Sequence, residues 1–113
     1  VLLVEDVALN RFLVEAMTAE WGIELEMAEN GAEGLKKVRQ ATYDLVLMDV
    51  QMPGIDGITA TRRLREDAAF ADLPIIALTA HALPEQVASF HAAGMNDYLP
   101  KPVCIRAPSG VTT

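Results

Sequence analysis

The stretch Asp44–Gly54, with the sequence DLVLMDVQMPG, decides the expected fold of this chain. Its apolar run predicts a strand over Asp44–Met48, and the run stops at Asp49 just before a Met-Pro-Gly turn. A continuous apolar run is typical of a strand that is buried on both faces of a parallel sheet. Ligands bind at the carboxyl ends of the strands in such α/β sheets, so Asp49 is a candidate for chemistry rather than for packing.

Length and composition indicate one α/β domain. The chain has 113 residues, of which 51% are hydrophobic and 5% aromatic, which suits a single core built on aliphatic side chains. The net charge is −7, so the chain lacks the excess of basic residues that binding to nucleic acid or an anionic membrane requires. An acidic chain can instead attract a divalent cation or a basic partner. The single cysteine, Cys104, excludes an internal disulfide and favours a reduced, cytoplasmic setting. We find no run of membrane-spanning length and no signal segment.

Four further segments have strand patterns. Val1–Val4 and Leu73–Leu78 are apolar runs, which predict strands buried on both faces. Ile23–Met27 alternates apolar residues with glutamates, and this pattern is typical of an edge strand with one wet face. Asp97–Pro102 predicts a short fifth strand that is interrupted by two prolines.

Helical patterns separate these strands. Four helices are predicted: Ala8–Trp21 stopped by Gly22, a second capped by Asn30 with Glu33, a third over Asp56–Glu66, and a fourth from Pro84 to Gly94. The apolar residues at helical spacing in the first helix are Leu9, Phe12, Leu13, Ala16 and Met17. The residues expected on the inner faces of the others are Ala32, Leu35, Val38, Ile58, Leu64, Leu83, Val87 and Phe90. Arg62, Arg63 and Arg65 are expected on a solvated helix face.

Strand and helix therefore alternate four times and end on a fifth strand. This alternation predicts a parallel sheet with helices on both faces. Residues 105–113 break the pattern, because a proline and a glycine stand in a segment of poor helix formers. We predict a domain of residues 1–104 followed by an irregular tail of residues 105–113.

Polar side chains fall at the predicted carboxyl ends of four strands: Glu5, Asp6, Asp49, Thr79 and Lys101. Adjacent strands lie about 5 Å apart, so these side chains can share one site. Three converging carboxylates repel one another unless a cation neutralises them. Mg²⁺ suits such a site because it binds carboxylates, keeps some waters and accepts phosphate oxygens. With an added ammonium and hydroxyl group, the set predicts a site for a metal ion and an oxyanion.

Each of these residues taken alone has a structural explanation. Glu5, Asp6 and Thr79 could cap helices, Asp49 could form a turn, and Lys101 could be a solvated charge. The functional interpretation depends on their occurring together, because acidic, hydroxyl and ammonium groups stand at the carboxyl ends of different strands.

With these residues placed, the chain resembles a receiver domain of a two-component response regulator. The segments that carry the resemblance are Val4–Asp6, Met48–Gly57, Ile76–Ala80 and Asp97–Pro102. They occur in the family's order and span the chain to about Val103. Their amino-acid sequences are most similar to those of receivers in hybrid sensor histidine kinases. The resemblance implies a flavodoxin-like, doubly wound, five-stranded parallel sheet of order 2-1-3-4-5.

The resemblance also implies how the acidic residues act. Asp49 would be the phosphoacceptor, and it would hold Mg²⁺ together with Asp6. Glu5 would contribute through water or as the second acid. Gln51 would supply its backbone carbonyl to the metal ion, so its side chain matters little there.

The remaining site residues receive roles from the same resemblance. Thr79 would hydrogen-bond the phosphoryl group, and Lys101 would pair with a phosphoryl oxygen. Tyr98 would be the switch aromatic that turns inward when Thr79 moves. The bond between Lys101 and Pro102 would be the family's cis peptide.

We therefore expect a phosphorelay domain that takes a phosphoryl group from a phosphohistidine of a histidine kinase or histidine phosphotransfer domain. It would not be a stand-alone enzyme, although it promotes its own phosphorylation and slow dephosphorylation. Receivers ordinarily end in a fifth helix, which we predict to be missing or disordered here. Its loss would expose apolar surface of the sheet and first helix and invite a partner or a homodimer. Contacts with nucleic acid or membrane are not expected.

Two alternatives stay open at this point. The first is a receiver-like interaction module that is not phosphorylated, although Asp6, Asp49 and Lys101 are all present. The second is a small Mg²⁺-dependent phosphohydrolase with an aspartate nucleophile. Such enzymes typically need a second acid two residues after the nucleophile, where this chain has Gln51.

Overall fold

The computed structural model describes residues 1–52, 54–80 and 82–101, and it contains a five-stranded sheet. The strands are β1 (Leu2–Val4), β2 (Glu26–Ala28), β3 (Val46–Asp49), β4 (Ile75–Thr79) and β5 (Asp97–Pro100). Every neighbouring pair is parallel, and the order is β2-β1-β3-β4-β5. The doubly wound sheet and its order, implied by the resemblance, are both confirmed.

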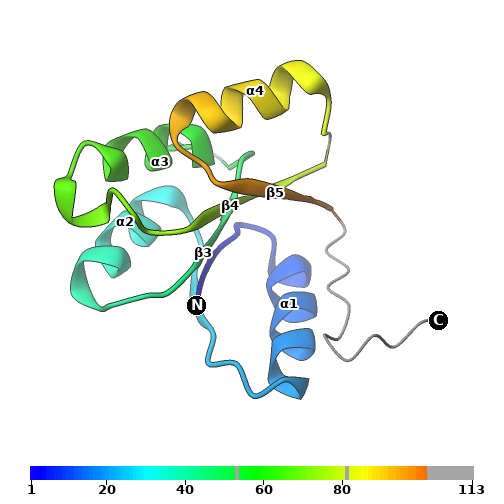
Figure 1. Ribbon diagram of the computed structural model, residues 1–113. Helices are drawn as coiled ribbons and strands as arrows, with labels where there is room; N and C mark the ends of the chain where they lie inside the picture. Colours follow the sequence, from blue (N-terminus) through cyan, green and yellow to red (C-terminus); the bar gives the residue numbers. More distant parts are fainter. Residues whose placement is uncertain (53, 81, 102–113) are drawn as a thin grey trace.

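Helices cover both faces of the sheet. They are α1 (Ala8–Glu20), α2 (Gly31–Gln40), α3 (Gly57–Arg65) and α4 (Pro84–Ala93), with a short 3₁₀ helix, η1 (Ala68–Phe70), before β4. Helix α1 lies on one face, and α2, α3 and α4 lie on the other (Figure 1). Leu3 of β1 accordingly packs with α1, whereas its neighbours Leu2 and Val4 pack in the cluster that includes the other three helices. Both faces are buried, which explains the continuous apolar runs.

The helix boundaries follow the predicted local signals. The Asn30 side chain accepts a hydrogen bond from the Glu33 N–H at 2.8 Å, and Asp56 accepts one from the Thr59 N–H at 2.8 Å. These bonds satisfy backbone donors that an isolated helix start leaves free. Gly94 ends α4 with φ of +105°, a left-handed conformation that glycine adopts at low cost.

Four predicted strands begin too early in the sequence, and the smallest difference is in β1, which begins at Leu2 rather than Val1. The pattern predicts a strand from Ile23, but β2 begins at Glu26 because its neighbour β1 offers only three residues for pairing. Similarly, β3 begins at Val46 rather than Asp44, and β4 begins at Ile75 rather than Leu73. The edge position predicted for β2 is confirmed.

Two inner-face predictions are wrong. Ala32 is exposed, because α2 instead turns Gly31 and Gly34 toward its neighbours, where an added Cβ would clash. Leu83 is also exposed, since it lies at the start of α4 and not within its packed face. Phe90 is buried, as predicted.

The first helix buries a different side from its apolar stripe. Val14 and Thr18 are its buried residues, whereas Leu9 and Phe12 are 64% and 65% exposed. The prediction that loss of a last helix exposes this surface depends on residues outside those that the structure describes, so only the exposure itself is observed. Helical spacing therefore shows which apolar residues share one side of α1, but it does not show whether that side faces the sheet.

Arg65 is not a solvated charge, which corrects the prediction for it. Its guanidinium donates to the carbonyl oxygen of Gly94 at 2.7 and 2.9 Å, to that of Phe70 at 2.6 Å and to Oδ1 of Asn96 at 2.9 Å. Arg65 thus ties the end of α3 to the turn between α4 and β5. Partial burial of the guanidinium lowers the pKa of Arg65.

Several predictions fall outside the described residues. They concern the turn at Pro53, the Lys101–Pro102 peptide bond, the boundary at residue 104, the tail of residues 105–113 and the absence of a last helix. Among the helices described, none combines the length and the apolar character that crossing a membrane requires.

Candidate functional site

The carboxyl ends of the parallel strands bring the predicted residues to one edge of the sheet. Glu5 and Asp6 directly follow β1, Asp49 ends β3, and Thr79 ends β4. The Lys101 N–H donates to the Thr79 carbonyl at 2.7 Å, which continues the pairing of β4 with β5. In a parallel sheet, residues from distant parts of the chain thus become neighbours.

A lysine and two buried carboxylates form the centre of this edge. Nζ of Lys101 lies 2.8 Å from Oδ1 of Asp49 and 3.2 Å from Oε2 of Glu5. The Glu5 and Asp49 side chains are 0% and 1% exposed, whereas that of Lys101 is 18% exposed. Two buried anions therefore share one cation, an arrangement that leaves excess negative charge in the site.

The surroundings of Asp49 favour its protonated form in the metal-free state. Burial raises the pKa of Asp49 from 3.8 to about 7, although hydrogen bonds from Lys101 and the Gln51 N–H oppose the shift. The nearby Glu5 also contributes to this rise in the pKa of Asp49. Burial alone would lower the pKa of Lys101, but the hydrogen bond and charge of Asp49 outweigh burial and raise it. A raised carboxylate pKa of this kind is common at functional sites.

The three carboxylates fit a divalent cation. Glu5, Asp6 and Asp49 each offer an oxygen, and these oxygens lie within 4.8 Å of one another. Oδ1 of Asp6 and Oδ2 of Asp49 are buried without a hydrogen-bond partner among the described residues. A buried carboxylate oxygen without a partner is costly, and a hard cation such as Mg²⁺ would satisfy both oxygens. The donor set thus fits the predicted magnesium ion.

The other predicted residues lie around this centre. The Gln51 N–H donates to Oδ1 of Asp49 at 3.1 Å, and the Gln51 side chain is exposed. Thr79 is 3% exposed at the end of β4. Tyr98 of β5 lies beside Ala77 of β4 and packs half-buried against the core cluster on the face covered by α2, α3 and α4. Tyr98 is therefore near the site, but no described contact joins it to Asp49.

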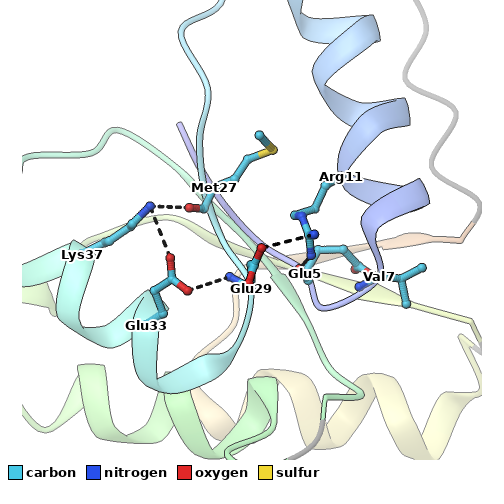
Figure 2. A network of polar contacts seen from close by, with 7 residues as sticks. All are labelled: Glu5, Val7, Arg11, Met27, Glu29, Glu33 and Lys37. Carbon is cyan, nitrogen blue, oxygen red and sulfur yellow. Dashed lines mark hydrogen bonds and ion pairs between the residues drawn. The ribbon is translucent and has the colours of Figure 1, made fainter.

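Two residues that the sequence analysis did not identify hold Glu5 from α1. Nδ2 of Asn10 donates to Oε1 of Glu5 at 2.9 Å. Figure 2 shows Arg11 reaching toward Glu5, where its guanidinium donates to the Glu5 carbonyl at 2.9 Å, and toward Glu29 at 3.5 Å. The signal that could have indicated them is the polar pair Asn10-Arg11 inside the otherwise apolar segment Ala8–Val14 of the first helix.

Gly57 allows the backbone after Asp49 to fold tightly against α3. A Cβ at Gly57 would lie 2.2 Å from the carbonyl oxygen of Asp49, closer than any side chain can approach. A larger residue would displace either the start of α3 or the end of β3. Gly57 thus helps to place Asp49 at the edge of the sheet.

The comparisons with known proteins agree with this geometry. The family model for the response regulator receiver domain matches residues 1–107. Sensor protein GacS of Pseudomonas syringae pv. syringae is 44% identical over 109 residues, which cover 94% of this chain. The matched region spans 12% of the length of that sensor protein.

Solved structures of receiver domains are also similar to this chain. One is the receiver domain of sensor histidine kinase PA1611 from Pseudomonas aeruginosa, which was solved with a magnesium ion coordinated in its active-site cleft. Its TM-score is 0.83 at 40% sequence identity, and the match covers 91% of this chain and 84% of the other. A chain from the co-crystal structure of the Saccharomyces cerevisiae phosphotransfer protein Ypd1 with the receiver domain of Ssk1 has a TM-score of 0.86 at 28% identity. That match covers 91% of this chain and 78% of the other. On its sequence, its sheet order and its acidic strand edge, the chain belongs to the family of response regulator receiver domains.

Proposed function

We propose that this domain accepts a phosphoryl group on Asp49 from a phosphohistidine of a histidine kinase or a histidine phosphotransfer domain. The observation that carries the proposal is the ion pair between buried Asp49 and Lys101, beside two further carboxylates at the strand edge. We assign the function to residues 1–104, which contain every site residue. As a separate domain it would promote only its own phosphorylation and slow dephosphorylation.

In the proposed reaction the Asp49 carboxylate attacks phosphorus in line with the bond to the histidine nitrogen. A P–O bond forms, the P–N bond breaks, and the departing imidazole takes a proton. Lys101 neutralises charge on the transferred group, which is the main contribution a protein makes to phosphoryl transfer. A magnesium ion held by Asp6 and Asp49, with Glu5 and the Gln51 carbonyl, would supply further charge neutralisation.

The phosphorylated state would act on a nearby surface. Phosphorylation adds about −1.5 to −2 charge and strong acceptor oxygens. Thr79 would hydrogen-bond the new group, and Tyr98 would follow its movement, so that the surface of α4 and β5 changes. We propose that this surface and the exposed stripe of α1 serve partner binding, with a second copy of the chain as one further partner.

The named relatives support the choice of metal and partner. Magnesium is coordinated in the PA1611 receiver, and a phosphotransfer protein is bound in the Ypd1–Ssk1 structure. A cytoplasmic location belongs to the same proposal and is supported by the single cysteine.

The test is phosphorylation of the full chain by phosphoramidate in the presence of Mg²⁺, followed by intact-mass measurement. We expect the mass to rise by one phosphoryl group in wild type and in Asp44→Asn, an exposed aspartate outside the site. Asp49→Asn should show no such gain. Equal labelling of Asp49→Asn would show that another residue is the acceptor.

Two measurements separate the two alternatives: the intact mass after treatment with phosphoramidate, and phosphate release from free phosphoesters. An unphosphorylated interaction module would gain no mass at any magnesium concentration. A phosphohydrolase would release phosphate from free phosphoesters over many turnovers, whereas a receiver should release at most the group that it has accepted.

A further inference from the structure

We propose that Asn10 is a positioning residue of the acidic site, which holds the Glu5 carboxylate in the orientation that metal binding requires. The inference rests on the proposed function, because it concerns the same magnesium site. It assigns a role to a side chain of α1 that lies outside the strand-end residues.

The contacts of Glu5 differ between its two carboxylate oxygens. Oε1 accepts hydrogen bonds from Nδ2 of Asn10 at 2.9 Å and from the Val7 N–H at 3.3 Å, and Lys101 lies 3.5 Å away. Oε2 accepts no hydrogen bond from the described residues, and its nearest charge is Lys101 at 3.2 Å. The donors on α1 and its preceding loop therefore bind Oε1, whereas Oε2 has only the ion pair with Lys101 among the described contacts and points to where a metal ion would compete.

Asn10 is the strongest of these donors by geometry. Its bond is the shortest to Oε1, and a neutral amide holds the carboxylate without competing with a cation for charge. Lys101 cannot fill this role alone, since it is shared with Asp49 at 2.8 Å. The Val7 N–H bond is longer and comes from the loop backbone.

Tight packing makes the bond hard to replace. The space between Glu5, Asn10, Leu13 and Lys101 has a volume of about 10 Å³, which is at the lower limit for one water molecule. The intact site therefore has almost no room for a water molecule that could donate to Glu5 beside the Asn10 amide. Without the amide, the Glu5 carboxylate would keep only the longer contacts with the Val7 N–H and Lys101, so its orientation would be less fixed, and fixing it on metal binding would cost conformational entropy.

The need for Asn10 follows from the length of Glu5. An aspartate at this position is one methylene shorter, so its carboxylate would end short of the Asn10 amide and would have fewer rotamers to restrict. If Asn10 acts through the Glu5 carboxylate, its effect should disappear when Glu5 is shortened. This dependence separates a positioning role from a general contribution of Asn10 to the stability of α1.

The experiment is a double-mutant cycle on the full chain, measured as the dissociation constant for Mg²⁺ by isothermal titration calorimetry. The variants are Asn10→Leu, which keeps the side-chain shape without its hydrogen-bonding groups, Glu5→Asp, and the two combined. We expect Asn10→Leu to weaken Mg²⁺ binding about 10-fold in the wild-type background. In the Glu5→Asp background the same substitution should change the dissociation constant less than about twofold.

Arg11→Lys is the matched control, because Arg11 contacts the Glu5 backbone carbonyl rather than its carboxylate. Its effect on Mg²⁺ binding should be the same in both backgrounds. Circular dichroism verifies that each variant is folded, and Asn10→Ala serves as a second variant if Asn10→Leu does not fold.

Two results would overturn the inference while leaving the proposed function intact. One is an unchanged dissociation constant in Asn10→Leu, and the other is an equal loss in both backgrounds, each with normal phosphorylation of Asp49 in wild type. Failure of the proposed function itself has a different outcome. Wild type would then bind no Mg²⁺ and gain no phosphoryl group, and the role assigned to Asn10 would fall with it.

Discussion

Opposing electrostatic effects set the pKa of Asp49. Burial and the neighbouring Glu5 favour the neutral acid, while Lys101 and the Gln51 N–H favour the carboxylate. Burial is the largest of these effects, so the pKa rises to about 7 in the metal-free site. A cation beside Asp49 would oppose this rise, because an opposite charge stabilises the carboxylate. The burial of Asp49 at the proposed phosphorylation site thus costs folding stability once its carboxylate is charged.

We predict that Asp49→Asn stabilises the metal-free protein at pH 8. The folded state has the higher pKa, so it binds more protons than the unfolded state between about pH 3.8 and 7, and stability falls as the pH rises through this window. Above pH 7 the full cost of the buried charge is present. The neutral isostere removes this cost and should raise the free energy of unfolding by up to about 4 kcal/mol, measured by urea denaturation with EDTA.

The gain should shrink as the pH falls and vanish below pH 3.8, where Asp49 is mostly protonated in both the folded and the unfolded state. Asp44→Asn, at an exposed position, should show no comparable gain at pH 8. A gain from Asp49→Asn that is constant from pH 4 to pH 8 would contradict the raised pKa.

At the scale of single elements, α1 is the helix whose orientation matters most. It carries the donors Asn10 and Arg11 toward Glu5 on one side. On another side it exposes an apolar stripe that includes Leu9 and Phe12. An exposed stripe of this kind is typical of a surface that binds another chain or segment.

We predict that substitutions on the two sides of α1 have very different effects on stability. Phe12→Ser should change the free energy of unfolding by less than about 0.5 kcal/mol, because the side chain is 65% exposed. Val14→Ala should cost about 1 to 3 kcal/mol, because Val14 is 1% exposed and packs with Leu3 and Leu47. Urea denaturation of both variants provides the measurement. Equal losses would mean that the stripe is covered in solution.

At the scale of the whole molecule, charge is concentrated at one edge of the sheet. The chain has a net charge of −7, and three of its carboxylates converge there with one lysine. Residues separated by most of the sequence meet at this edge, such as Glu5 and Lys101. Folding therefore brings like charges together, and a bound cation should favour the folded state.

We predict that Mg²⁺ stabilises the folded chain through this site. A ligand that binds only the folded state at 100 times its dissociation constant adds about 2.7 kcal/mol to the free energy of unfolding. The gain should be smaller at pH 5, where Asp49 is largely protonated in the metal-free protein. Sodium chloride at equal ionic strength is the control, and an equal effect of the two salts would contradict a specific site.

The sequence by itself determined the number of strands, the helix caps and the composition of the site, although not where each strand begins. Apolar runs that alternate with helical patterns indicate a parallel sheet, and the carboxyl ends of parallel strands meet at one edge. Glu5, Asp6, Asp49, Thr79 and Lys101 could therefore be assigned to one site from their positions alone. The strand order came from the resemblance to receiver domains and was confirmed.

Only the tertiary structure decided which side of α1 faces the sheet and which side chains complete the site. Helical spacing shows which residues share a face, but the packing of the whole molecule selects the face that is buried. Asn10 and Arg65 illustrate the same limit, because each hydrogen-bonds groups on other elements that no local pattern connects to it. Such contacts depend on distances in the folded chain, and sequence spacing carries no information about those distances.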